Sequence, residues 1–162
     1  MAEIVLMRHG HSLSAREAGV ASDSERPLSQ QGEKEALETS LHLKASGFTP
    51  DLIISSPFAR ADRTAAIAAE VFPGTLRKTE PSLSEGPLQA LLELILHTFP
   101  EKSRVLVVGH QPLLGAAGGF MLGMDIFDLS PAGFIRLTFT KEPGAGSLTE
   151  FYIPPPSGEQ SR

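Results

Sequence analysis

Short apolar runs separated by segments with helical periodicity constrain the fold of this chain more than any other feature. Ile4–Leu6, Leu52–Ile54 and Val105–Val108 are uniformly apolar, which is typical of strands buried on both faces. Strands that alternate with helices predict a parallel sheet with helices on both sides. We therefore expect an α/β fold, arranged as a three-layer αβα sandwich with a mostly parallel sheet.

The C-terminal part predicts an antiparallel hairpin at one edge of this sheet. Ile135, Leu137 and Phe139 alternate with polar residues, residues 142–146 are typical of a turn, and residues 148–153 form a second strand. Residues 76–79 predict a further short strand. Proline at 154–156 cannot continue a ladder. One domain at 1–153 and a disordered tail at 154–162 follow from this pattern.

Capping residues and periodicity predict the helices between the strands. One helix is expected from an N-cap at Ser29 to about residue 46, with Leu37 and Leu41 on one face. A second is expected from Ser56, as N-cap, to Phe72. Others are expected over residues 88–99, closed by Pro100, and after Gln111-Pro112. Residues 14–26 predict a loop or a loose turn.

Composition excludes several classes of function. Cysteine is absent, so thiolate catalysis, disulfides and cysteine-based zinc sites are excluded. The net charge of -5 and the lack of a basic cluster argue against nucleic acid or an anionic membrane as partner. The most apolar later stretch, residues 112–124, is too short to span a bilayer. We expect a cytoplasmic monomer.

Charged groups follow three of the predicted strands. Arg8 and His9 end the first strand, Arg60 lies in the helix after the second, and His110 ends the clearest strand. The carboxyl ends of the strands are where α/β sheets bind ligands. Guanidinium groups hold phosphate oxygens through paired hydrogen bonds, and a neutral imidazole is a competent nucleophile. These residues predict a phosphoryl-transfer site.

The same segments resemble the motifs of the histidine phosphatase superfamily, which has the phosphoglycerate mutase-like fold. Met7-Arg8-His9-Gly10 resembles its first motif, Ser55-Ser56-Pro57-Phe58-Ala59-Arg60-Ala61-x-x-Thr64 its second, and Val108-Gly109-His110 its third. The short chain and Arg26-Pro27-Leu28-Ser29-x-x-Gly32 look most like the SixA phosphohistidine phosphatases. The resemblance extends from about residue 3 to residue 140.

The resemblance implies roles for the residues in these motifs. His9 would be the nucleophile that becomes phosphorylated, and Arg8, Arg60 and His110 would complete the phosphate pocket. No metal and no cofactor is implied. The neighbouring Arg63 is expected to pair with a carboxylate.

Two further positions, Glu85 and Arg26, keep two interpretations each, and a third position has one. Glu85 follows a Leu-x pattern that in the family precedes the general acid, or it is an ordinary loop carboxylate. Arg26 either contacts substrate at the rim or lies on the surface, and Ser12 is a candidate to line the pocket.

The interval between residues 64 and 109 is too short for the helical lid that larger relatives insert there. An open pocket suits phosphohistidine on a protein partner. One alternative is a small phosphate ester, hydrolysed with Glu85 as general acid. Another is a metal-dependent hydrolase that uses His9 and His11.

Overall fold

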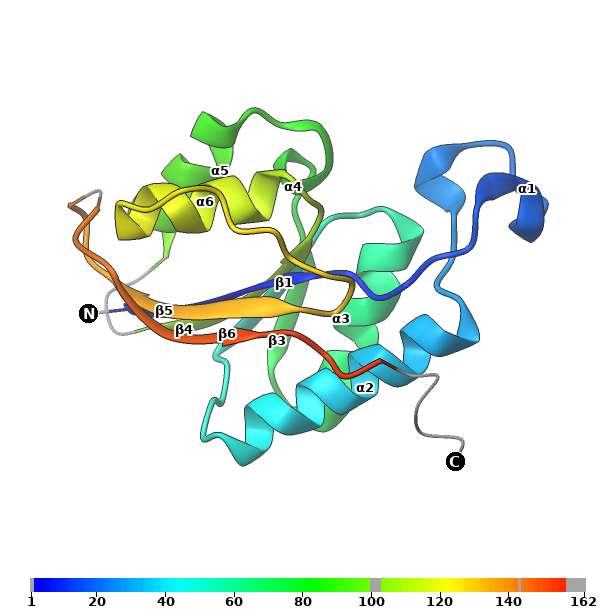
Figure 1. The fold of residues 1–162 in the computed structure, drawn as a ribbon, viewed down its shortest axis with the longest axis horizontal. Helices are drawn as coiled ribbons and strands as arrows, with labels where there is room; N and C mark the ends of the chain where they lie inside the picture. The colour runs from blue at the N-terminus through cyan, green and yellow to red at the C-terminus, as the bar shows by residue number, and fades with distance from the viewer. Residues whose placement is uncertain (1, 100–102, 143, 157–162) are drawn as a thin grey trace.

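A six-stranded mixed sheet forms the centre of the molecule in the computed structural model, which describes residues 2–99, 103–142 and 144–156 (Figure 1). The spatial order is β3-β2-β4-β1-β5-β6. The first four of these are parallel, whereas β5 is antiparallel to β1 and to β6, which confirms the predicted fold class and its edge hairpin. The strands are β1 Ala2–Arg8, β2 Leu52–Ser55, β3 Leu76–Thr79, β4 Arg104–Gly109, β5 Phe134–Phe139 and β6 Ser147–Tyr152.

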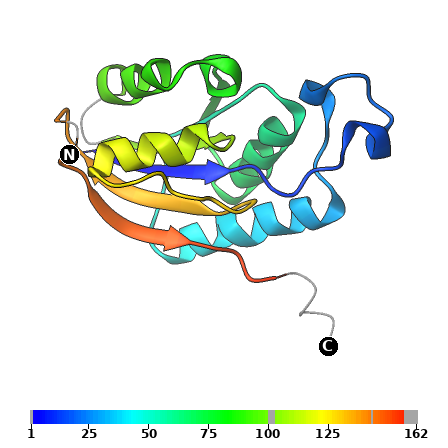
Figure 2. The same ribbon diagram turned by 45° about the horizontal axis from the view of Figure 1, so that its top comes forward.

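Helices cover both faces of the sheet (Figures 1 and 2). One layer contains α2 (Gln30–Ala45) and α3 (Ala59–Val71). The other contains α6 (Leu113–Leu122) and α5 (Leu88–Glu93), which is preceded by α4 (Ser82–Glu85) and continued by the π-helical turn η2 (Leu94–Thr98). Among the helices that the structure describes, none is long and apolar enough to cross a membrane.

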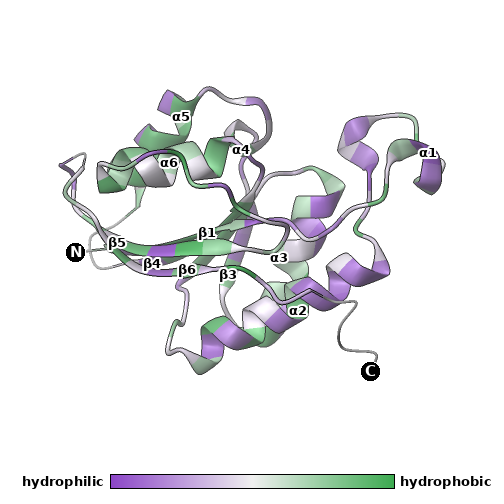
Figure 3. Ribbon diagram, viewed as in Figure 1, coloured by the Kyte–Doolittle hydropathy of each residue, from purple (hydrophilic) through white to green (hydrophobic). Residues whose placement is uncertain are grey.

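The strands divide their side chains between two apolar cores. In β1, Ile4 and Leu6 pack under α5 and α6, whereas Val5 and Met7 pack against the α2 and α3 layer, and all four are fully buried. Figure 3 shows the same distribution, with apolar strands inside and polar outer faces on α2. The apolar runs are therefore strands buried on both faces, as their sequence predicts.

The predicted apolar face of α2 was wrong. Leu37 and Leu41 are 42% and 50% exposed, and the helix instead buries Ala36 and Leu43. A close backbone approach sets this orientation. A Cβ on Gly10 would lie 2.6 Å from the Gly32 carbonyl oxygen, so the first turn of α2 packs directly on the chain that leaves β1.

Two other local predictions need correction. Helix α3 begins at Ala59 and not at the predicted Ser56 cap, because Phe58 is still extended (φ -60°, ψ 139°). Residues 14–26 are not simply a loop. They contain α1 (Ala15–Ala18), which begins with a reciprocal capping box between Ser14 and Glu17, and the 3-10 turn η1 (Asp23–Glu25).

The remaining predictions about elements concern chain ends. Helix α5 and η2 occupy most of the predicted helix at 88–99. Its expected end at Pro100 and the predicted disorder of residues 157–162 lie outside the described residues.

Candidate active site

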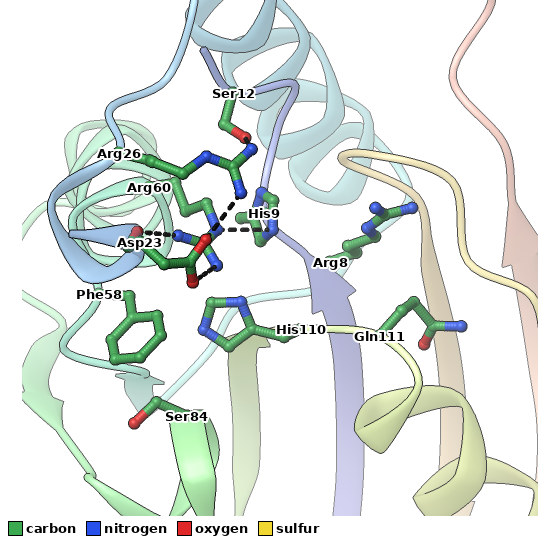
Figure 4. Close-up of a pocket in the computed structure, with 10 residues that line it drawn as sticks. All are labelled: Arg8, His9, Ser12, Asp23, Arg26, Phe58, Arg60, Ser84, His110 and Gln111. Atoms are coloured by element: carbon green, nitrogen blue, oxygen red, sulfur yellow. Dashed lines mark hydrogen bonds and ion pairs between the residues drawn. The ribbon is translucent and has the colours of Figure 1, made fainter. Parts of the chain in front are cut away.

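The strand order explains how distant residues meet at one edge of the sheet. β2, β4 and β1 are neighbours and parallel, so their carboxyl ends lie together. Arg8 pairs with Gly109, and the next residues, His9 and His110, leave the sheet side by side with their ring centroids 5.2 Å apart. Arg60 reaches them from α3 (Figure 4).

His9 is held in one orientation. Its Nδ1 lies 2.7 Å from the carbonyl oxygen of Gly10, and because a carbonyl only accepts, Nδ1 carries the proton. The other nitrogen, Nε2, accepts a hydrogen bond from Nε of Arg60 at 3.3 Å. Burial is the main cause that lowers the pKa of His9 from 6.5 to about 3; the hydrogen bond to Gly10 opposes this shift, and the charges of Arg60 and Arg8 favour it. The imidazole is therefore neutral at physiological pH, with a lone pair on Nε2.

His110 is held by a buried serine. Its Nε2 lies 2.8 Å from Oγ of Ser56, which also accepts the backbone N–H of Phe58 at 3.1 Å. Burial and, to a smaller extent, the charge of Arg60 lower the pKa of His110 to about 4, while Asp23 opposes the shift. His110 is thus neutral in the ligand-free protein. A bound phosphate dianion would raise its pKa, because an anion favours the charged imidazole.

The two arginines differ in how their nitrogens are used. In Arg60, which is 7% exposed, Nη1 donates to the backbone oxygen of Asp23 at 2.7 Å and Nη2 donates to its carboxylate at 3.0 Å. Arg8 donates from Nη1 to the Leu129 oxygen at 3.0 Å, while its buried Nε has no hydrogen-bond partner. Burial lowers the pKa of Arg8.

These side chains line a pocket of about 330 Å³ that also includes Ser12 and Arg26. Arg26 donates to Oγ of Ser12 at 2.8 Å, to the Leu13 oxygen at 2.9 Å and to the Asp23 carboxylate at 2.9 Å. The structure therefore places both predicted rim residues at the pocket.

Four lining residues were missed from the sequence, namely Asp23, Phe58, Ser84 and Gln111. Asp23 lies in the segment that was predicted to be a loop, and its contact with Arg60 is long-range, so no local pattern marks it. Gln111 follows His110 directly, but its side-chain amide donates to the Phe127 oxygen and accepts the Gly115 N–H, so both ends are bonded within the protein.

Two predicted side chains are not brought into the pocket. Glu85 is exposed at the end of α4, where its neighbour Ser84 lines the pocket instead. His11 is exposed and bonded through Nδ1 to Oγ of Ser29 at 2.7 Å. In the part of the chain that the structure describes, no three His, Cys, Asp or Glu side chains are grouped so that they could hold a metal ion.

Two imidazoles and the guanidinium of Arg60 meet at one pocket at the strand ends of an α/β protein, and Arg8 lines the same pocket. The chain belongs to the histidine phosphatase superfamily, because the model of branch 1 of this family matches residues 4–89. An uncharacterised protein of Picosynechococcus sp. is 35% identical over 117 residues, which are 70% of this chain and 68% of that protein. GpmB of Cronobacter sakazakii, named as a phosphoglycerate mutase, is 36% identical over 43% of this chain and only 32% of its own length.

Solved structures share the fold along almost the whole chain. The protein histidine phosphatase SixA in complex with tungstate has a TM-score of 0.84 at 24% identity, covering 94% of this chain and 97% of that one. SixA of Agrobacterium tumefaciens has a TM-score of 0.82 at 25% identity, covering 94% and 98%. Phosphoserine phosphatase of Entamoeba histolytica has a TM-score of 0.68 at 19% identity, covering 93% and 96%.

Proposed function

We propose that the protein is a phosphatase that hydrolyses phosphohistidine on a protein partner through a phosphorylated intermediate on His9. The observation that carries the proposal is the state of His9 itself. The imidazole is neutral, and its unprotonated Nε2 faces Arg60 in the pocket. The hydrogen bond from Nδ1 to the Gly10 oxygen keeps the ring in this tautomer. Nucleophilic attack needs such a lone pair, presented without a proton.

The reaction would proceed in two displacements. Nε2 of His9 attacks phosphorus, the bond to the leaving group breaks, and the phosphoryl group is carried by His9. Water then attacks that phosphorus, which releases inorganic phosphate and restores the imidazole. Arg8, Arg60 and His110 would hold the equatorial oxygens, whose charge they offset in both steps.

The substrate class is inferred from the surroundings of the pocket. After α3, the described residues between the second and third motifs form β3, the short helices α4 and α5, the turn η2 and β4, with no long helix among them to cover the pocket. Rim residue Asp23 has a side chain that is 60% exposed. Such a rim admits a phosphorylated side chain that remains attached to a folded partner. The structural likeness to SixA proteins supports the same class.

Small phosphate esters are the second candidate, supported by the fold shared with phosphoserine phosphatase. An alkoxide leaves poorly without a proton donor. Glu85, the acid that this candidate was predicted to use, is exposed and does not line the pocket. We therefore rank the candidate second.

The test is to offer the protein a chemically phosphorylated histidine peptide and a panel of alkyl and aryl phosphates. Rapid quenching should trap phosphate on the protein that is labile in acid and stable in base. His9→Ala is expected to abolish both the trapped phosphate and turnover. Full turnover by His9→Ala would overturn the mechanism, and activity on alkyl esters alone would overturn the substrate class.

A further inference from the structure

Asp23 provides a carboxylate at the rim of the pocket, and among the described lining residues it is the only acidic one. It comes from η1, which lies beyond the end of the sheet, and it is 37 residues from Arg60 in the sequence. Figure 4 shows its carboxylate between the guanidinium of Arg60 and the ring of His110. Arg60 joins it to His9, because Nε of Arg60 contacts His9 while Nη1 and Nη2 contact Asp23. His9, Arg60 and Asp23 therefore lie in order from the floor of the pocket to its rim.

The two carboxylate oxygens have different partners. Oδ1 accepts from Nη1 of Arg26 at 2.9 Å, and Oδ2 accepts from Nη2 of Arg60 at 3.0 Å. A phosphate that takes the N–H of Arg60 Nη2 now bonded to Oδ2 replaces the Asp23 carboxylate there, whereas Nη1 bonds the backbone oxygen of Asp23. Phosphate binding would therefore release Oδ2 toward the mouth of the pocket, while Arg26 still holds Oδ1.

We propose that the released Asp23 oxygen accepts a hydrogen bond from the protonated imidazole of a phosphohistidine, which makes the pocket selective for P–N over P–O bonds. The inference rests on the proposed function and extends it to the leaving group. A phosphoryl group attacked by His9 at the floor of the pocket has its leaving group at the rim, where Asp23 lies. Phe58 lines the same pocket, where its ring already contacts the guanidinium of Arg60 and the ring of His110, so a planar imidazole beside them would meet an aromatic wall.

The chemistry needs no proton donor from the protein. When one imidazole nitrogen carries the phosphoryl group and the other carries a proton, the P–N electron pair departs onto the first nitrogen. The product is a neutral imidazole that keeps its proton. A carboxylate bound to that N–H favours the protonated form before the bond breaks, and so improves the leaving group.

The charge state of Asp23 agrees with this role. Hydrogen bonds from Arg26 and Arg60 lower the pKa of the Asp23 carboxyl, so the group is ionised at neutral pH. An ionised carboxylate can accept a hydrogen bond from an imidazolium. It cannot supply the proton that an alkoxide leaving group requires.

The test compares two substrates in Asp23→Asn, which keeps the shape of the side chain and removes its charge. The substrates are a phosphohistidine peptide and p-nitrophenyl phosphate, whose leaving group departs without a proton. We expect the ratio of kcat/KM for the peptide to kcat/KM for the aryl phosphate to fall at least tenfold. Asp23→Glu should restore much of the ratio. Asp62→Asn removes another arginine-paired carboxylate, outside the pocket, and should leave both activities unchanged.

The possible results separate this inference from the proposed function. If Asp23→Asn changes both substrates by the same factor, or changes neither, the role of Asp23 in binding the leaving group is overturned while phosphohistidine hydrolysis stands. If the unmodified protein turns over the aryl phosphate through His9 but not the peptide, the proposed function itself fails and the inference fails with it.

Discussion

Arg60 and Arg63 lie one helical turn apart on α3 but have different surroundings. Arg60 is 7% exposed and contacts His9 and Asp23. The Arg63 side chain is 45% exposed and forms a two-bond pair with Glu33, at 3.0 and 3.1 Å, which confirms the prediction that it pairs with a carboxylate. Residue type and spacing alone do not distinguish the two, but burial does.

Replacing each arginine by glutamine should separate these roles. Arg60→Gln removes a charge that faces the phosphate, and we expect kcat/KM to fall at least about a hundredfold. Arg63→Gln breaks an exposed ion pair and should lower the free energy of unfolding by less than about 1 kcal/mol, with activity retained. Steady-state kinetics and urea unfolding check both. Equal losses of activity would contradict the assignment of Arg60 to the pocket.

His9 makes stability depend on pH in a defined direction. In the unfolded chain it takes up a proton near pH 6.5, whereas its pKa in the folded protein is about 3. Between these values the unfolded state binds more protons, so stability is complete above about pH 6.5 and falls as the pH is lowered. His110, with a pKa of about 4, acts in the same direction.

We therefore expect the free energy of unfolding of His9→Gln to fall less steeply with decreasing pH than that of the unmodified protein. The slope of unfolding free energy against pH should decrease by up to about 1.4 kcal/mol per pH unit, the value for one proton. Urea unfolding measured at several pH values between 4 and 6.5 tests this. An unchanged slope would mean that the buried imidazole is already protonated in the folded state.

At the scale of elements, the junction between β1 and α2 depends on two glycines in contact. A Cβ on Gly32 would collide with the carbonyl oxygen of His11. The contact explains why the last position of Arg26-Pro27-Leu28-Ser29-x-x-Gly32 is a glycine, since no other residue lacks a Cβ. It also explains the burial of Ala36 and Leu43 in place of Leu37 and Leu41, since α2 is fixed at its first turn and not by its largest side chains.

Gly32→Ala should therefore destabilise the protein by about 1 to 3 kcal/mol, the usual cost of overpacking. Gly109→Ala is the matched control, because a Cβ there would meet Leu114 at 3.5 Å, an ordinary contact, and it should cost less. The midpoint of urea unfolding measures both. A Gly32→Ala protein as stable as the control would show that the junction can relax.

The elements that sequence predicts well are those that local pattern determines. The strands β1, β2 and β4 follow from continuous apolar runs, and α2 follows from its Ser29 cap, whose Oγ accepts the Gly32 N–H at 3.0 Å. Long-range contacts account for what was missed. Ser56 was predicted to cap α3, but its hydroxyl contacts His110. The carboxylate predicted for the site was Glu85, as a general acid, whereas Asp23 lines the pocket.

At the scale of the whole molecule, sites on β1, on α3 and after β4 are joined only when the sheet and its covering helices are assembled. An anion bound between them therefore favours the folded state by linkage. Inorganic phosphate at a hundredfold excess over its Kd should raise the free energy of unfolding by about 2.7 kcal/mol. Thermal unfolding with sodium chloride at equal ionic strength as control measures this. Arg60→Gln should lose most of the effect, and equal stabilisation of both proteins would contradict binding in the pocket.

Because Arg8 pairs with Gly109, the site is assembled only when β1 and β4 are paired in the correct register. A slip of one residue between β1 and β4 would move Ile4 and Leu6 to the core that now holds Val5 and Met7, and the reverse, although all four are fully buried where they are. It would also carry the His9 imidazole about 3.3 Å along the strand, away from its partner ring. A molecule with that register would be inactive. A one-residue insertion within β1 should therefore abolish turnover, as replacement of His9 should.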